Sequence, residues 1–239
     1  GMCMIGGSGN VSLGMGTRQQ AVGGNHNIAI GCYANCANNS QNHNVYMGYF
    51  AGKKNGCCGC ANGCFNIAMG CAAGEYGFGC SNNIAIGHSA GAAVTNGKCN
   101  TIIGAFAGAA ITAGNLNVLI GAYTGRGITC GSHNIMMGRK IACTSGATGN
   151  SNIILGQCAA MQLSSGVSNV IIGGSSGRCI TTGNSNVLLG NTVGYGITTG
   201  SYNFFGVGGA GTCGFKGCNN VAIGHVAMNQ ATGDNTNNN

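Results

Sequence analysis

A five-residue motif, an asparagine followed by three mostly apolar residues and a glycine, recurs along the whole chain. It reads Asn117-Val118-Leu119-Ile120-Gly121 in one copy and Asn169-Val170-Ile171-Ile172-Gly173 in another. Most copies recur with a period of about 17 residues, and the interval from Gly48 to Gly70 is the longest. A fixed period of this kind is typical of solenoids, in which each repeat forms one turn and contacts only its neighbours.

The residues within one period predict β-structure. The apolar run at 118–120 has β propensity and lies between asparagine and glycine, which form turns. A second short apolar piece, residues 110–112, is half a period away, so two short strands and two turns fit one coil. Helical repeats need longer, glycine-poor segments and periods above about 30 residues. We therefore predict an all-β, single-stranded parallel β-solenoid: one chain wound into a β-roll of about 13 coils. Residues 1–239 are expected to form a single domain, with an irregular long coil over 49–70 and a polar C-terminal tail over 233–239.

The asparagine that opens each motif is the most regular feature. In stacked coils, identical amide side chains can form a ladder like those of cross-β stacks. Asparagine also tolerates the left-handed conformation of tight turns. We predict a structural ladder, with a ligand-binding stripe as the alternative. It comprises Asn27, Asn44, Asn66, Asn83, Asn100, Asn117, Asn134, Asn152, Asn169, Asn186, Asn203 and Asn220, with Asn10 preceding them.

Side chains alternate between the two faces of a strand. The first and third apolar residues, such as Val118 and Ile120, are predicted to face inward. The middle residue is bulky from Leu119 to Leu188, and we predict that it faces outward, covered there by a partner chain; scattered exposed apolar residues are the alternative. The motif at Asn203 has one residue fewer before its glycine, which predicts a bulged or shortened strand.

The repeat resembles those of a known class of surface proteins. The run Asn83-Ile84-Ala85-Ile86-Gly87-His88-Ser89-Ala90-Gly91 is similar to the head repeats of trimeric autotransporter adhesins, and equally to repeats of phage tail-fibre proteins. The resemblance covers nearly the whole chain. It implies a left-handed parallel β-roll that assembles as a homotrimer and serves attachment. Side-by-side association would also enlarge the small core of each narrow coil.

Composition argues against several other functions. Nine basic and two acidic residues give a net charge of +7, but the basic residues are scattered rather than arranged in a stripe with stacking aromatics, so we expect no nucleic-acid partner. The sequence lacks an apolar run long enough to cross a bilayer and a recognisable signal peptide, so no membrane insertion is expected. The acids, Glu75 and Asp234, are about nine coils apart, too far for paired-carboxylate chemistry. We expect no enzyme activity and no cofactor.

Sixteen cysteines and five histidines suggest metal chemistry only weakly. The long coil contains Cys57, Cys58, Cys60 and Cys64, which fit two C-x2-4-C pairs only by sharing one residue. A loop with free or disulfide-bonded thiols is the competing interpretation. Cys143 and Cys179 occupy positions that suit a narrow interior, where free cysteine behaves as a small apolar residue.

Two further side-chain columns follow from the period. The histidine rings of His26 and His43, one coil apart, are expected to stack about 5 Å apart. A hydroxyl column that could bind ice or a glycan, or merely reflect β propensity, comprises Thr95, Thr112, Thr129, Thr181 and Thr198. The sequence thus favours a structural or adhesive protein, a segment of a viral tail fibre or of a surface adhesin head, located on a virion or outside the cell. Its expected ligand is a host-surface glycan or protein receptor, and an ice-binding or other surface-binding solenoid is the alternative.

Overall fold

The computed structural model describes residues 7–19, 23–36, 41–53, 63–76, 78–212 and 216–228. The chain divides into two compact units, residues 1–122 and 123–239. The polar tail over 233–239 and the middle of the irregular coil, residues 54–62, lie outside the described residues.

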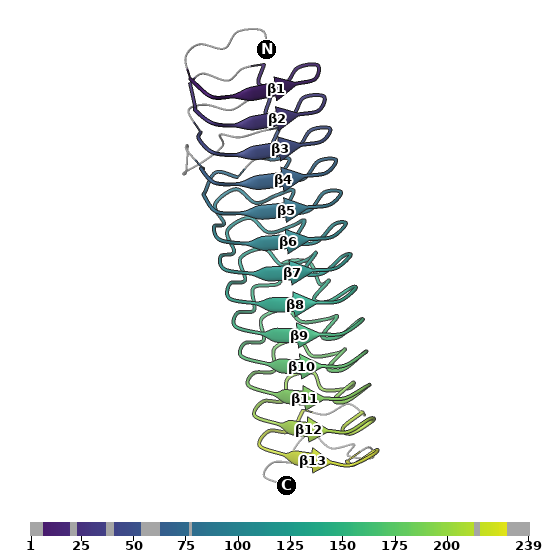
Figure 1. The fold of residues 1–239 in the computed structure, drawn as a ribbon. Coiled ribbons are helices and arrows are strands. Elements are labelled where there is room, and N and C mark those ends of the chain that lie inside the picture. The colour runs from purple at the N-terminus through teal and green to yellow at the C-terminus, as the bar shows by residue number, and fades with distance from the viewer. Residues whose placement is uncertain are drawn as a thin grey trace. The chain divides into compact units, whose positions relative to one another are not determined.

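The described part of the first unit contains seven three-residue strands, all parallel to their neighbours. Ile84 pairs with Thr101, one coil further on, and Figure 1 shows these strands stacked in chain order. They are β1 (Val11–Leu13), β2 (Ile28–Ile30), β3 (Val45–Met47), β4 (Ile67–Met69), β5 (Ile84–Ile86), β6 (Thr101–Ile103) and β7 (Val118–Ile120).

The described part of the second unit contains six strands of the same length and direction. Val170 pairs with Val187, again one period apart. The strands are β8 (Ile135–Met137), β9 (Ile153–Leu155), β10 (Val170–Ile172), β11 (Val187–Leu189), β12 (Phe204–Gly206) and β13 (Val221–Ile223). In both units, therefore, one repeat makes one turn of a parallel β-solenoid, as predicted.

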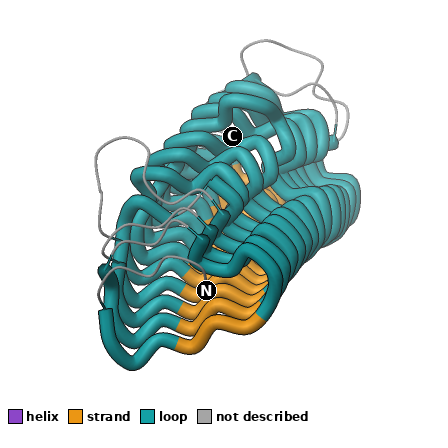
Figure 2. Tube along the Cα trace, turned by 90° about the horizontal axis from the view of Figure 1, so that it is seen from above, coloured by secondary structure: helices purple, strands orange, loops and turns teal. Residues whose placement is uncertain are grey.

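Each described coil has one strand, and the second strand expected around residues 110–112 is not formed. Figure 2 shows the strands on one side of the coils and turns on the others. Left-handed residues such as Phe106 (φ 56°) and Gly108 (φ 51°) interrupt extended backbone there. Hydrogen bonds still join neighbouring coils on the side opposite the strands. For example, the Thr95 N–H donates to the Thr112 carbonyl at 3.1 Å.

The predicted direction of the strand side chains is wrong. The middle residue points inward: Leu119 and Ile171 are fully buried, whereas the flanking residues of most strands are half-buried or exposed. The buried asparagine explains this direction. Asn117 and Leu119 are two residues apart, and residues two apart in a strand share a face. Because the Asn117 amide is buried, the Leu119 side chain must point inward as well.

The core consists of two apolar columns on opposite sides of the coil. One is the strand centre. The other precedes the threonine column and comprises the buried residues Val94, Ile111, Ile128, Leu163, Ile180 and Ile197. In the coil whose strand centre is Ala68, the aromatic residue Phe78 is buried as well. Small buried residues, Ala90 and Ala107 among them, confirm that the interior is narrow beyond the turn glycine.

Strand β12 is neither bulged nor shortened, contrary to expectation. Phe205 pairs with Leu188, and Gly206 takes the place of the third apolar residue opposite Leu189. The position of the turn glycine is then occupied by Val207, at φ 73°. The ladder asparagines on either side keep the regular spacing of 17 residues, from Asn186 to Asn203 and from Asn203 to Asn220, so no residue is missing.

Candidate functional site

The asparagine ladder is confirmed, and its amide groups are used inside the protein. The Asn100 backbone N–H and its Nδ2 both donate to Asn83 Oδ1, at 3.1 and 3.0 Å. Nδ2 also donates to the Gly114 carbonyl at 2.8 Å, and Asn100 Oδ1 accepts two bonds from Asn117. In the second unit, Asn169 makes the equivalent bonds. The ladder residues from Asn27 to Asn220 are at most 1% exposed. They hold the coils together and do not face a ligand.

The left-handed conformation predicted for these asparagines falls instead on the residue before each of them. His43, Ser168 and Tyr202 have φ values of 57° to 58°. Their side chains lie on the outside of the coil. In the first unit they form the predicted ring stack: the His26 and His43 centroids are 5.2 Å apart, and Phe65 continues it at 5.0 Å from His43.

The outward residues of the strands form an apolar face on each unit. None of the described strands contains a charged residue. In the second unit, exposed fractions of 37% to 65% are found for Ile135, Met137, Ile153, Ile172, Leu189, Phe204, Val221 and Ile223. In the first unit, Val11, Leu13, Met69 and Ile86 are exposed in the same way. We call each of these surfaces the apolar strand face. The middle residues, which were predicted to face outward, are buried and do not belong to it.

The threonine column lies on the other side of the coil, and the hydroxyl groups of three of its residues bond to neighbouring coils. Oγ1 of Thr95 donates to the Thr112 carbonyl at 3.3 Å, and Oγ1 of Thr181 donates to the Thr198 carbonyl at 3.1 Å. Thr129 donates in the same way to Ala147 at 3.3 Å. These hydroxyl protons stabilise the coil contacts, and binding of ice or glycan through this column stays a prediction.

The cysteine cluster of the long coil falls mostly outside the described residues, which include Cys64 but not Cys57, Cys58 or Cys60. Cys64 is half-buried. The described residues contain no group of three or more histidine, cysteine or acidic side chains placed to hold a metal. Cys143 and Cys179 are half-buried rather than interior, so the position predicted for both is wrong. Their coil positions lie at the turns instead of in the two core columns.

Arg18, which the sequence did not single out, is a buried cation at the first described coil. Its Nη1 donates to Asn10 Oδ1 at 2.6 Å, and its Nη2 donates to the Gly23 carbonyl at 3.1 Å. Burial lowers the pKa of the guanidinium from its ordinary value. Several other coils have glycine at this position, for example Gly52 and Gly91, and that contrast could have identified it. The side chain supplies the first ladder asparagine with an extra donor.

One coil of the second unit departs from the repeat. Its asparagines, Asn134 and Asn152, are 18 residues apart. Three residues after the turn glycine, where other coils have alanine, serine, threonine or, at Val193, valine, this coil has the fully buried Ile141. The chain then forms an exposed turn at Ser145 and Gly146 before it rejoins the repeat. In this coil the core side chain is Ile141, at a position that differs from the regular core columns, and the neighbouring turns differ from those of the other coils.

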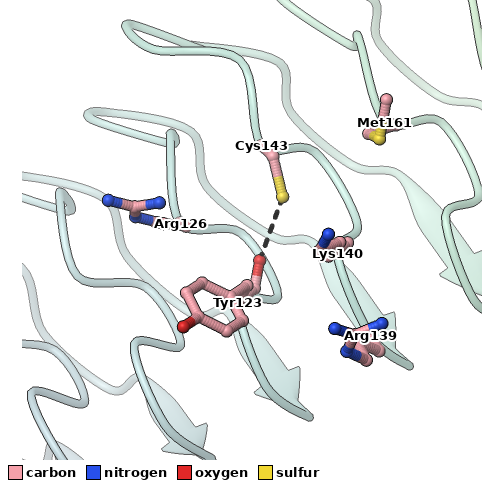
Figure 3. A pocket seen from close by; sticks show the side chains of 6 residues that line it. All are labelled: Tyr123, Arg126, Arg139, Lys140, Cys143 and Met161. Atoms are coloured by element: carbon pink, nitrogen blue, oxygen red, sulfur yellow. Dashed lines mark hydrogen bonds between the residues drawn. The ribbon is translucent and has the colours of Figure 1, made fainter.

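A basic pocket lies beside this irregular coil. Six residues line a hollow of about 440 Å³: Tyr123, Arg126, Arg139, Lys140, Cys143 and Met161. Figure 3 shows the Tyr123 ring between Arg126 on one side and Arg139 with Lys140 on the other. The Arg126 guanidinium carbon is 5.6 Å from the centroid of that ring. The three cationic residues are exposed, and the tyrosine is half-buried.

The pocket wall includes a thiol with a perturbed pKa. Cys143 Sγ donates to the Tyr123 carbonyl at 3.2 Å. Burial raises the pKa of this thiol, while the charges of Arg126 and Lys140 oppose the shift. The net effect favours the protonated, donating form. The sequence interpretation missed the pocket because it treated the basic residues as scattered. Arg126 and Lys140 are separated by slightly less than one period, and that spacing was the available signal.

Comparisons with protein-family models, characterised proteins and solved structures found no match for this chain. The described residues form no helix that could cross a lipid bilayer.

Proposed function

We propose that this protein is a structural, adhesive solenoid, a segment of a viral tail fibre or of a surface adhesin head. Copies of the chain associate as a homotrimer through the apolar strand faces. The remaining sides are presented to a glycan or protein receptor on a host surface. The observation that carries the proposal is the uncharged, apolar outer face of the strands.

A second copy of the chain fits this face better than an unrelated partner. The outward side chains repeat at the strand spacing of about 4.8 Å, and an identical solenoid offers the same repeat, coil against coil. Only 5% of the residues are charged, against about 25% in ordinary soluble domains. Interfaces between identical subunits are more apolar than other protein interfaces. Three copies rather than two are proposed from the resemblance of residues 83–91 to trimeric adhesin repeats.

The adhesive part of the proposal is supported by aromatic side chains on the turns. After strand β3, the Tyr49 and Phe50 ring centroids are 3.9 Å apart, and Lys53 Nζ lies 3.7 Å from the centroid of the Phe50 ring. Tyr49 is 49% exposed. Rigid aromatic side chains of this kind contribute strongly to binding surfaces. The turns therefore offer contact sites that the apolar strand face does not use.

Sedimentation equilibrium of the wild-type protein tests the assembly. We expect three times the chain mass. The double variant Ile153→Lys/Ile172→Lys places two cations on the apolar strand face, where copies would bring like charges together, and we expect a folded monomer.

The matched control is Gln162→Lys/Thr182→Lys, which adds the same charge at turn positions outside the strands. It should remain trimeric. Circular dichroism shows whether each variant is folded. A wild-type protein that is monomeric at all concentrations, or a face variant as trimeric as the control, would contradict the proposal.

A further inference from the structure

We propose that the basic pocket of the second unit binds an acidic saccharide, a sugar with a carboxylate or sulfate group. The inference rests on the proposed function, because it names the class of glycan that the adhesive surface would recognise. It is argued from the charge, the shape and the local character of the pocket.

The charge of this region is positive and is not balanced by acidic residues of the same segment. Residues 123–161 include Arg126, Arg139 and Lys140 and no acid; the whole chain has only Glu75 and Asp234. Three cations that line one hollow raise the local concentration of anions. Arginine also binds carboxylate and sulfate-like oxygens through two parallel N–H groups.

The shape suits a small ligand rather than a flat surface contact. A hollow of about 440 Å³ falls within the range of small-molecule sites, roughly 300–1,000 Å³. The Tyr123 ring offers an apolar face with a hydroxyl group, and the cations lie to either side of it (Figure 3). A pyranose ring can place its C–H groups against the tyrosine while its acidic group reaches a cation. An inorganic anion would use the cations alone.

The pocket is a local feature and not a consequence of the repeat. In the next coils, the positions of Arg139 and Lys140 are occupied by neutral residues: Gln157 and Cys158, Gly174 and Ser175, and Asn191 and Thr192. The buried Ile141 and the turn at Gly146 are likewise confined to this coil. The change in winding and the charges therefore occur together.

Single-stranded nucleic acid is a less suitable ligand. Proteins that bind it present successive aromatic rings along a basic groove. The coil positions that follow Tyr123 at one-period intervals are Lys140 and Cys158, so no row of rings continues from the tyrosine. One ring with flanking cations matches a single acidic sugar unit.

Isothermal titration calorimetry of the full chain tests the inference with defined probes. A sialylated trisaccharide supplies the carboxylate, and a heparin-derived tetrasaccharide supplies sulfate groups. Lactose is the neutral comparison, and inorganic sulfate is the bare anion. We expect at least one acidic saccharide to bind more tightly than both lactose and inorganic sulfate, and more weakly as salt increases.

The variant Arg139→Gln/Lys140→Gln should weaken that binding about tenfold or more, because charged hydrogen-bond partners are lost. The control Lys98→Gln/Arg178→Gln removes the same charge elsewhere. Arg178 is a close match to Arg126, since its guanidinium carbon is 5.6 Å from the Tyr195 ring centroid. The control should change the dissociation constant by less than about twofold.

Three results would overturn the inference: no binding of either acidic saccharide, equally tight binding of inorganic sulfate, or equal weakening by both double variants. These results are independent of the assembly measurement. A trimer that does not bind acidic saccharides would refute the inference and leave the proposed assembly intact. A monomer whose pocket binds acidic saccharides would refute the proposed assembly and leave the inference intact.

Discussion

Ile171 and Ile172 are neighbours in strand β10 with the same side chain in opposite environments. Ile171 belongs to the inner column, is fully buried and lies on the same face as the ladder asparagine Asn169. Ile172 belongs to the apolar strand face and is 39% exposed. The solenoid thus uses identical residue types for two purposes: the inner column fills the narrow interior, and the outer columns leave apolar surface available. Hydrophobicity alone does not distinguish them, but position relative to the asparagine does.

Removing a ladder amide should have the largest effect on stability. Asn169→Ala deletes the Nδ2 bonds to Asn152 Oδ1 and Gly183 O and the Oδ1 acceptor for two donors of Asn186. Buried polar groups left without a partner each cost about 1–3 kcal/mol, so we expect a loss of roughly 3–6 kcal/mol in urea denaturation. Asn191→Ala, at an exposed asparagine, is the control and should change the unfolding free energy by under about 0.5 kcal/mol. Similar losses in both variants would show that the ladder does not fix the inner face.

The sequence allowed prediction of the period, the strands and the ladder, because these follow from identical residues recurring at one spacing. It did not fix which strand residues face inward, since all three residues of Val118–Ile120 are apolar and either alternation looks equally hydrophobic. The position of Asn117 contained the answer, because a buried amide must share its face with Leu119. The basic pocket was less accessible to sequence reasoning. It depends on how the coil places Arg126 and Lys140 around one hollow, and on Ile141 entering the core from a position where other coils have alanine, serine, threonine or valine.

Truncating the two isoleucines of strand β10 tests the comparison directly. Ile171→Ala leaves a cavity in the fully buried core, and we expect the unfolding free energy to fall by about 2–5 kcal/mol. Ile172→Ala removes a side chain already in contact with water, so the loss should be under about 1 kcal/mol in dilute solution. Thermal unfolding over a range of protein concentrations separates the two.

The cost of Ile172→Ala should grow with concentration as the trimer forms, because assembly stabilises the folded state by mass action. The cost of Ile171→Ala should not. If the loss of unfolding free energy does not depend on concentration at either position, the outer columns do not take part in self-association, even if the inner column behaves as described.

The smallest expected effect is an increase in the unfolding free energy. Gly206 occupies an outward position in strand β12, and a Cβ added there would have only Phe204 Cε1 nearby, at 4.0 Å. Gly206→Val should therefore extend the apolar strand face and raise the unfolding free energy by about 0.5–1 kcal/mol, since glycine is costly in a strand. Gly173→Ala is the contrasting control: Gly173 is at φ 134°, and its Cβ would overlap the Gly190 carbonyl oxygen, so this variant should be destabilised. If Gly206→Val also lowers the midpoint of thermal unfolding, the outward strand positions do not accept larger side chains. The contrast between the buried Ile171 and the exposed Ile172 would then not extend to strand β12.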